Sequence, residues 1–110
     1  MSALVKQITD ANQNTAFSLT EMGFKLDRPA ELMVYFSTNT QEKASMLAKN
    51  LKSLGFAKNQ ISSSHLDWKI TSEIKMPIST FISRHFVEQL ADAILSNKCK
   101  FQGWQKKYIL

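Results

Sequence analysis

The sequence predicts one α+β domain with the ferredoxin-like βαββαβ arrangement, a two-layer sandwich preceded by an additional N-terminal helix. Three observations predict it. The helical and strand-like patterns follow in the order helix, then β-α-β-β-α-β. One strand pattern alternates apolar and polar residues over twelve positions. The chain has 110 residues, 44% hydrophobic and 21% charged, which suits one core. We expect a single domain over 1–110, with the N-terminal helix in 1–24 and the βαββαβ core in 30–110.

Two helices are predicted by the same signals. Apolar residues recur at helical spacing in residues 3–22 and again in residues 40–54. Both patterns end in the dipeptide Gly-Phe, at Gly23 and at Gly55, which is typical of a Schellman motif with its hydrophobic contact. Asn39, with a glutamate three residues later, is expected to cap the start of the second helix.

Four strands complete the predicted sheet. Residues 31–36 (ELMVYF) form a short run of strand-forming residues after a proline, which indicates a central strand. The poorly patterned stretch 57–64 indicates an edge strand, whose polar edge could pair with a second copy or with a partner strand. Residues 65–76 alternate apolar and polar side chains, with Ser72 as the one polar residue in the apolar register, and residues 98–102 form an amphipathic last strand with a lysine face.

A third helix and two tryptophans are expected to complete the core. Ser79 can cap a helix whose apolar stripe runs from Ile82 to Ile94. Trp68 lies in the inward register of the alternating strand, and Trp104 follows Gly103, a residue that permits a turn. We expect both tryptophans to be largely buried.

Nothing in the sequence indicates catalysis, a cofactor or a metal site. The two histidines, His65 and His85, have no metal-ligand spacing, and Cys99 is the only cysteine, which is typical of cytoplasmic proteins. The glycines do not form a phosphate loop. No apolar run is long enough to span a membrane and no secretory signal is present. We therefore expect a cytoplasmic binding protein that is not an enzyme, is not attached to a membrane, and is a monomer or a weak dimer.

The net charge of +5 favours an acidic partner, either a protein surface or RNA. RNA-recognition modules bind RNA through aromatic residues on the outer face of the sheet, within the RNP1 motif of a central strand. The polar side of residues 65–76 holds no aromatic residue. A protein partner is therefore favoured over RNA. The candidate partner-binding residues are those expected on solvent-facing sides of the strands or near the chain end: Met33, Tyr35, His65, Lys69, Lys98, Lys100, Lys106 and Lys107.

Both faces of the strand 31–36 are apolar, and Met33 and Tyr35 point to the side opposite Leu32, Val34 and Phe36. Two helices of a βαββαβ core cover only one sheet face. We expect the helix of residues 3–22, or a partner protein, to cover these two side chains.

Five segments together resemble one family. They are a helix ending in MGF, the strand DRPAELMVYF, the helix QEKASMLAKNLKSLGF, the strand LDWKI and the terminal FQGW. These look like the RraB family, regulators of ribonuclease E activity. The resemblance implies a ferredoxin-like domain with an added N-terminal helix, which inhibits RNA cleavage through protein–protein contact.

The chain departs from this family in two respects. Family members tend to end in a tyrosine–aspartate–glycine–tryptophan element, where this chain has Phe101 and Gln102 before Gly103 and Trp104. The characterised regulators look strongly acidic, whereas this chain is basic. Two alternatives therefore stay open: an immunity- or antitoxin-type inhibitor, and an RNA-binding domain that uses Lys98, Lys100, Lys106 and Lys107.

Overall fold

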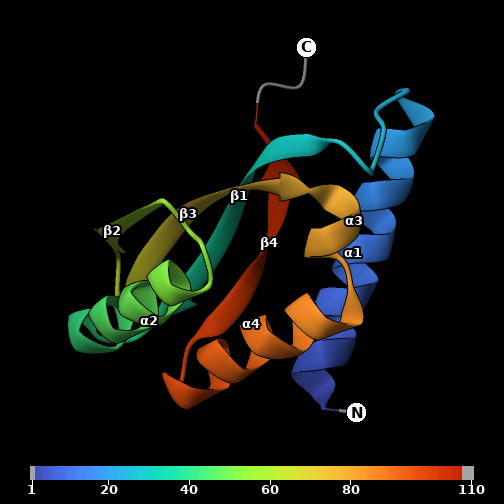
Figure 1. Cartoon of the computed structure of the whole chain (residues 1–110). Coiled ribbons are helices and arrows are strands. Elements are labelled where there is room, and N and C mark those ends of the chain that lie inside the picture. The colour runs from blue at the N-terminus through green and yellow to red at the C-terminus, as the bar shows by residue number, and fades with distance from the viewer. Residues whose placement is uncertain (1, 108–110) are drawn as a thin grey trace.

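The computed structural model describes residues 2–107, which form four helices and four strands (Figure 1). It has a four-stranded antiparallel sheet. The elements are α1 (Ala3–Glu21), β1 (Pro29–Thr38), α2 (Gln41–Ser53), β2 (Lys58–Ser64), β3 (Asp67–Pro77), α3 (Ile78–Phe81), α4 (Arg84–Ser96) and β4 (Lys100–Lys106).

The strands lie in the order β2-β3-β1-β4, so that β1 and β3 form the centre of the sheet. They pair over the whole of β1, from Pro29 opposite Pro77 to Thr38 opposite Trp68. The predictions of a central strand at 31–36, a long alternating strand at 65–76 and an edge strand at 57–64 are therefore confirmed, with boundaries shifted by a few residues. β2 and β4 are the two edges.

One face of the sheet is covered by α2 and α4 (Figure 1). Alternate residues of β1 point into this layer, and Leu32, Val34 and Phe36 are at most 1% exposed. The Phe36 ring meets the rings of Phe56 and Phe101 edge-on, with centroids 6.5 and 6.2 Å away. Because edge-to-face pairs are favourable in addition to the area they bury, this aromatic group joins α2, β1 and β4 into one core.

The N-terminal helix does not cover Met33 and Tyr35. α1 packs against α4 and β4 instead, and buries Ile8, Ala16 and Leu19 there. Two hydrogen bonds attach it to β4: Trp104 Nε1 donates to Asn12 Oδ1 at 2.8 Å, and Gln7 Nε2 donates to the carbonyl of Phe101 at 3.1 Å. The expectation that this helix shields the second sheet face is wrong, because its apolar side packs against α4 and the edge strand β4.

Both predicted Schellman motifs are present. The Phe24 N–H donates to the Leu19 carbonyl at 3.0 Å, and the Phe56 N–H donates to the Leu51 carbonyl at 3.1 Å. Gly23 and Gly55 provide the left-handed residue, with φ of 90° and 107°.

The predicted helix starts need two corrections. α2 is capped by Thr40, whose Oγ1 accepts from Lys43 N at 3.2 Å, and not by Asn39. The expected third helix is divided, because Ser83 Oγ accepts from Phe86 N and starts a new helix there. Ser79 lies inside the one-turn α3 and caps nothing.

The strand ends also differ from the prediction. β3 begins at Asp67, because His65 and Leu66 form the turn of the β2–β3 hairpin, with His65 at φ 55° and Leu66 91% exposed. Trp68 is only partly buried, contrary to expectation. Gly103 lies in a bulge of β4 and not in a turn, with φ of 112°. The bulge inserts one residue, so that Phe101 and Trp104 both point into the core although they are three positions apart.

Candidate binding surface

The second face of the sheet has no helix packed over it in the described part of the chain, and we call it the open face. Because paired residues of an antiparallel sheet share a face, the register fixes its members. Met33 of β1 lies opposite Glu73 of β3, and Tyr35 lies opposite Thr71. The neighbouring strands add polar residues in the same register, and the open face comprises Glu31, Met33, Tyr35, Ser37, Lys58, Gln60, Ser62, Ser64, Asp67, Lys69, Thr71, Glu73, Lys75, Lys100, Gln102 and Gln105.

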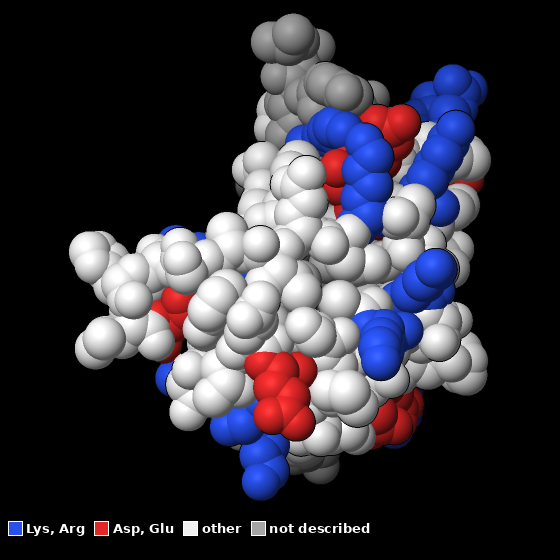
Figure 2. All heavy atoms as spheres, turned by 90° about the vertical axis from the view of Figure 1, so that its left-hand side faces the viewer, with Lys and Arg blue, Asp and Glu red and all other residues white. Residues whose placement is uncertain are grey.

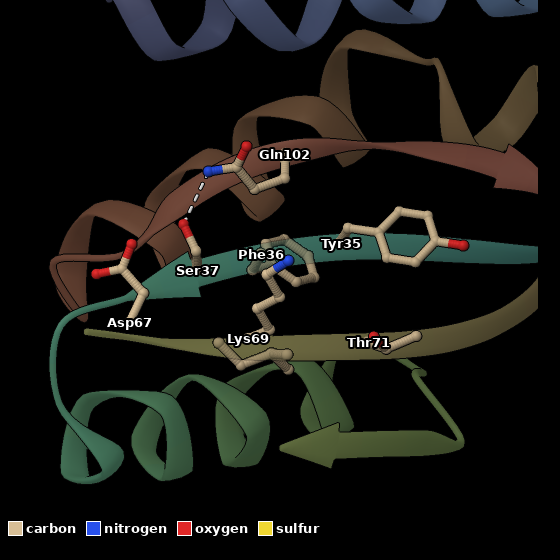
Figure 3. Close-up of a pocket in the computed structure, with 8 residues that line it drawn as sticks. Tyr35, Phe36, Ser37, Asp67, Lys69, Thr71 and Gln102 are labelled. Carbon is tan, nitrogen blue, oxygen red and sulfur yellow. Dashed lines mark hydrogen bonds between the residues drawn. The ribbon is translucent and has the colours of Figure 1, made fainter. Parts of the chain in front are cut away.

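A shallow hollow of about 470 Å³ lies near one end of this face. Tyr35, Lys69 and Gln102 reach it from three different strands, as Figure 3 shows. Gln102 Nε2 donates a 2.8 Å hydrogen bond to Ser37 Oγ, which fixes the amide at the rim. The remaining lining residues are Phe36, Ser37, Asp67, Ile70 and Thr71. The hollow therefore offers one aromatic ring, one cation, one carboxylate and several hydrogen-bonding groups.

An ion pair closes the opposite end of the open face. Lys107 Nζ donates to Glu73 Oε1 at 2.6 Å, and the two side chains are only 22% and 23% exposed. The hydrogen bond from Lys107 holds the pKa of Glu73 below its usual value. The Lys107 N–H also donates to the Glu31 carbonyl at 2.8 Å, so this lysine is bonded to both β1 and β3.

The structure brings some of the predicted binding residues together and separates others. Met33, Tyr35, Lys69 and Lys100 lie on the open face, and the Lys107 ammonium reaches it through Glu73. Three residues lie elsewhere: Lys106 places its ammonium 4.6 Å from the centre of the Phe24 ring, His65 lies in the hairpin turn, and Lys98 lies in the turn between α4 and β4. The eight residues thus do not form one surface, and their role in binding stays a prediction.

Gln102, Thr71 and Asp67 were missed as members of the hollow. The alternation predicted for residues 98–102 places Gln102 on the same side as Lys100, which is the signal that could have identified it. The positions of Asp67 and Thr71 depend on the pairing of β3 with β1, which brings residues more than 30 positions apart side by side.

The remaining reactive groups do not gather into a second site. Cys99 is half-buried, and burial raises the pKa of its thiol, so the nucleophilic thiolate is disfavoured. Within residues 2–107, no group of three His, Cys, Asp or Glu side chains could hold a metal ion. None of the described helices has the length and apolar character needed to cross a membrane.

Charges of both signs lie on the side of the molecule that carries β2. Figure 2 shows lysines and arginines separated by acidic side chains and by uncharged surface on the side of the molecule that carries β2. Lys58, Lys69 and Lys100 are among the cations of the open face.

Comparison with known proteins identifies the family. No curated protein matches the chain. The family described as Regulator of ribonuclease activity B matches residues 9–105. This range includes most of α1 and all four strands, apart from the last residue of β4. The chain therefore belongs to the RraB family of regulators of ribonuclease activity.

Proposed function

We propose that this protein regulates a ribonuclease by binding to it, similar to the inhibitors of ribonuclease E activity, and that it carries out no chemistry itself. The family match over residues 9–105 is the observation that carries the proposal. A ribonuclease that processes or degrades cellular RNA works in the cytoplasm, so the proposal places this protein there. The free, half-buried thiol of Cys99 suits that reducing environment.

We further infer that the fold is the ferredoxin-like βαββαβ sandwich with an added N-terminal helix. The element order and the strand order β2-β3-β1-β4 support this assignment. In such a sandwich the helices cover one face of the sheet, and the other face stays available for contacts with a partner. In this protein that face is the open face.

The proposed contact surface is the open face around Tyr35. Tyr35 and Met33 are partly exposed apolar side chains in the middle of a polar face, and Lys69 and Lys100 flank the hollow beside them. Aromatic residues surrounded by polar groups are typical of the centre of a protein interface. The lysines favour a partner segment that is acidic, because complementary charge raises the rate of association.

The direct test is a cleavage assay with a purified ribonuclease of the E type and an RNA substrate. We expect the wild-type protein to lower the cleavage rate, and we expect Tyr35→Ala with Lys69→Glu and Lys100→Glu to relieve most of that inhibition. The matched control is Lys49→Glu with Lys52→Glu, which changes two exposed lysines of α2, on the helix-covered side. Inhibition that survives the open-face variant unchanged would place the contact elsewhere.

Capture of partners from a cell extract separates the proposal from its alternatives. We expect a ribonuclease to be retained after nuclease treatment of the extract. Retention of a single small toxin would instead indicate an immunity- or antitoxin-type inhibitor. Loss of all partners on nuclease treatment would indicate an RNA-binding domain, for which Tyr35 is the one aromatic residue that the open face offers for stacking within the described chain.

A further inference from the structure

The two edge strands of the sheet differ in what lies beside them. The β4 edge lies beside α1, which holds it through the Asn12–Trp104 and Gln7–Phe101 hydrogen bonds. β2 lies at the other end of the sheet, and no element of the described chain pairs with its outer side (Figure 1). An edge strand of this kind exposes a row of backbone N–H and C=O groups that can bind another strand.

β2 also lacks the devices that usually protect an edge. Its seven residues, KNQISSS, contain no proline, and Lys58 at the start is the only charged residue. The pairing of β2 with β3 shows no bulge between Lys58 and Ser64. Figure 2, which looks at this side of the molecule, shows uncharged surface across the middle with charged residues around it. A regular, uncharged edge is open to pairing.

The apolar side chain of β2 lies at the margin of the core. Leu47 of α2 and Ile70 of β3 are 0% exposed at the centre of the layer. Ile61 of β2 and Trp68 of β3 are only partly buried, as are apolar residues at other margins of the core. A further strand beside β2 would bury more of the Ile61 side chain, which adds a hydrophobic contribution to the backbone hydrogen bonds.

We propose that a second copy of this chain binds at β2, so that two β2 strands pair antiparallel across a twofold axis and the two sheets become one. With the axis at Ile61, the midpoint of the strand, Ile61 meets Ile61 of the second copy. Gln60 then lies opposite Ser62, Asn59 opposite Ser63 and Lys58 opposite Ser64.

This register suits a self-complementary contact. The apolar residue meets its own copy on the helix side, and Lys58 meets a serine and not another lysine. On the helix side, Asn59 already accepts from Ser72 Oγ at 2.6 Å, so its side chain is positioned and partly satisfied before association. Interfaces of this twofold type are the commonest among homo-oligomers.

Long-range charge opposes the association. Each copy carries a net charge of +5, so two copies repel at low ionic strength. Salt screens this repulsion, and the dimer should therefore strengthen as salt rises. Binding of an acidic ribonuclease segment should weaken under the same change, so the two interactions are distinguishable by their salt dependence.

The experiment is analytical ultracentrifugation of the full chain over a concentration series at low and high salt. We expect a reversible monomer–dimer equilibrium that shifts toward dimer in high salt. Gln60→Lys with Ser62→Lys places lysines opposite one another at the seam while both positions stay on the solvent side of the strand. We expect this variant to weaken dimerisation at least about tenfold, because like charges directly opposite each other destabilise strand pairing.

Two further variants make the test specific. Gln60→Glu with Ser62→Glu should also dimerise poorly alone, but a mixture of the lysine and glutamate variants should form a mixed dimer, which requires that β2 faces β2. Gln89→Lys with Ser96→Lys is the matched control, because it makes the same two changes at exposed positions of α4 and should dimerise as the wild type does.

Several results would overturn the proposal. A wild-type chain that stays monomeric at the highest soluble concentration in high salt has no such interface. A dimer that the lysine variant leaves intact uses another surface, and so does a dimer whose charge variants fail to pair when mixed. None of these results depends on whether a ribonuclease is bound.

Discussion

Replacing Trp104 with phenylalanine tests the attachment of α1 to the sheet. Trp104 is 6% exposed, its Nε1 donates to Asn12 Oδ1 at 2.8 Å, and its ring lies 5.0 Å from the ring of Phe81. Asn12 is 2% exposed, and its Nδ2 has no hydrogen-bond partner in the described structure. Trp104→Phe keeps an aromatic ring against Phe81 but removes the only hydrogen bond found for the Asn12 amide.

The expected cost follows from these contacts. Leaving the buried Asn12 Oδ1 without a donor costs about 1–3 kcal/mol. The smaller ring adds the loss of buried apolar area, about 1 kcal/mol at roughly 25 cal/mol per Å². We therefore expect Trp104→Phe to lower the free energy of unfolding by about 2–4 kcal/mol. A domain of this size is stable by about 5–15 kcal/mol, so the variant should still fold.

Urea unfolding monitored by circular dichroism measures this cost, and a double-mutant cycle assigns it to the hydrogen bond. Asn12→Leu alone should destabilise as well, because it leaves the Trp104 N–H unpaired. The double variant should lose at least ~1 kcal/mol less than the sum of the single variants, since both polar partners are then replaced by apolar groups. Additivity to within about 0.5 kcal/mol would refute the reasoning, because uncoupled sites behave in that way.

Three further outcomes are expected. Lys98→Gly should stabilise the fold by up to about 1 kcal/mol in urea unfolding, because Lys98 has φ of 54° and a left-handed backbone is costly for residues with a Cβ; an unchanged midpoint would contradict this. Glu73→Gln should melt earlier than the wild type at neutral pH. The lowered pKa of Glu73 gives a contribution that is present above its ordinary pKa near 4.5 and is lost as pH falls through the lower folded value, so the two melting curves should converge in acid. Cys99 should react with a thiol reagent more slowly in the folded than in the urea-unfolded protein, because burial raises its pKa; equal rates would show an accessible thiolate.

The elements of this fold were predictable from local signals. Gly23 and Gly55 mark helix ends because the left-handed backbone at the end of a Schellman motif is cheapest for glycine. A third helix end has the same geometry without a glycine. Lys98 occupies the same left-handed position after α4, and the Cys99 N–H donates to the Ile94 carbonyl at 3.0 Å. Without a glycine, the sequence carries no signal for this motif.

Features that depend on long-range packing were not predictable. The alternation at 65–76 does not show that a two-residue turn ends at Leu66, which is 91% exposed. Nor does the pattern of α1 show which face of the sheet it covers, because α4 and β4 offer an apolar surface that exists only after folding. The inward position of Trp104 required the bulge at Gly103, and a glycine in a strand predicts a bulge only where the partner strand is known.

The lysines near the chain end show why sequence alone could not define the binding site. Their closeness in the sequence suggests one basic cluster, yet in the structure each lysine lies in a different environment. Lys106 covers the Phe24 ring and Lys107 bonds to Glu73, so reversing their charge would disturb the fold together with any binding. Lys100 is exposed on the open face, as is Lys69 of β3, and neither makes a salt bridge among the described residues. A loss of binding on charge reversal can therefore be assigned to a partner contact at Lys69 and Lys100, whereas the same loss at Lys106 or Lys107 would report on folding as well.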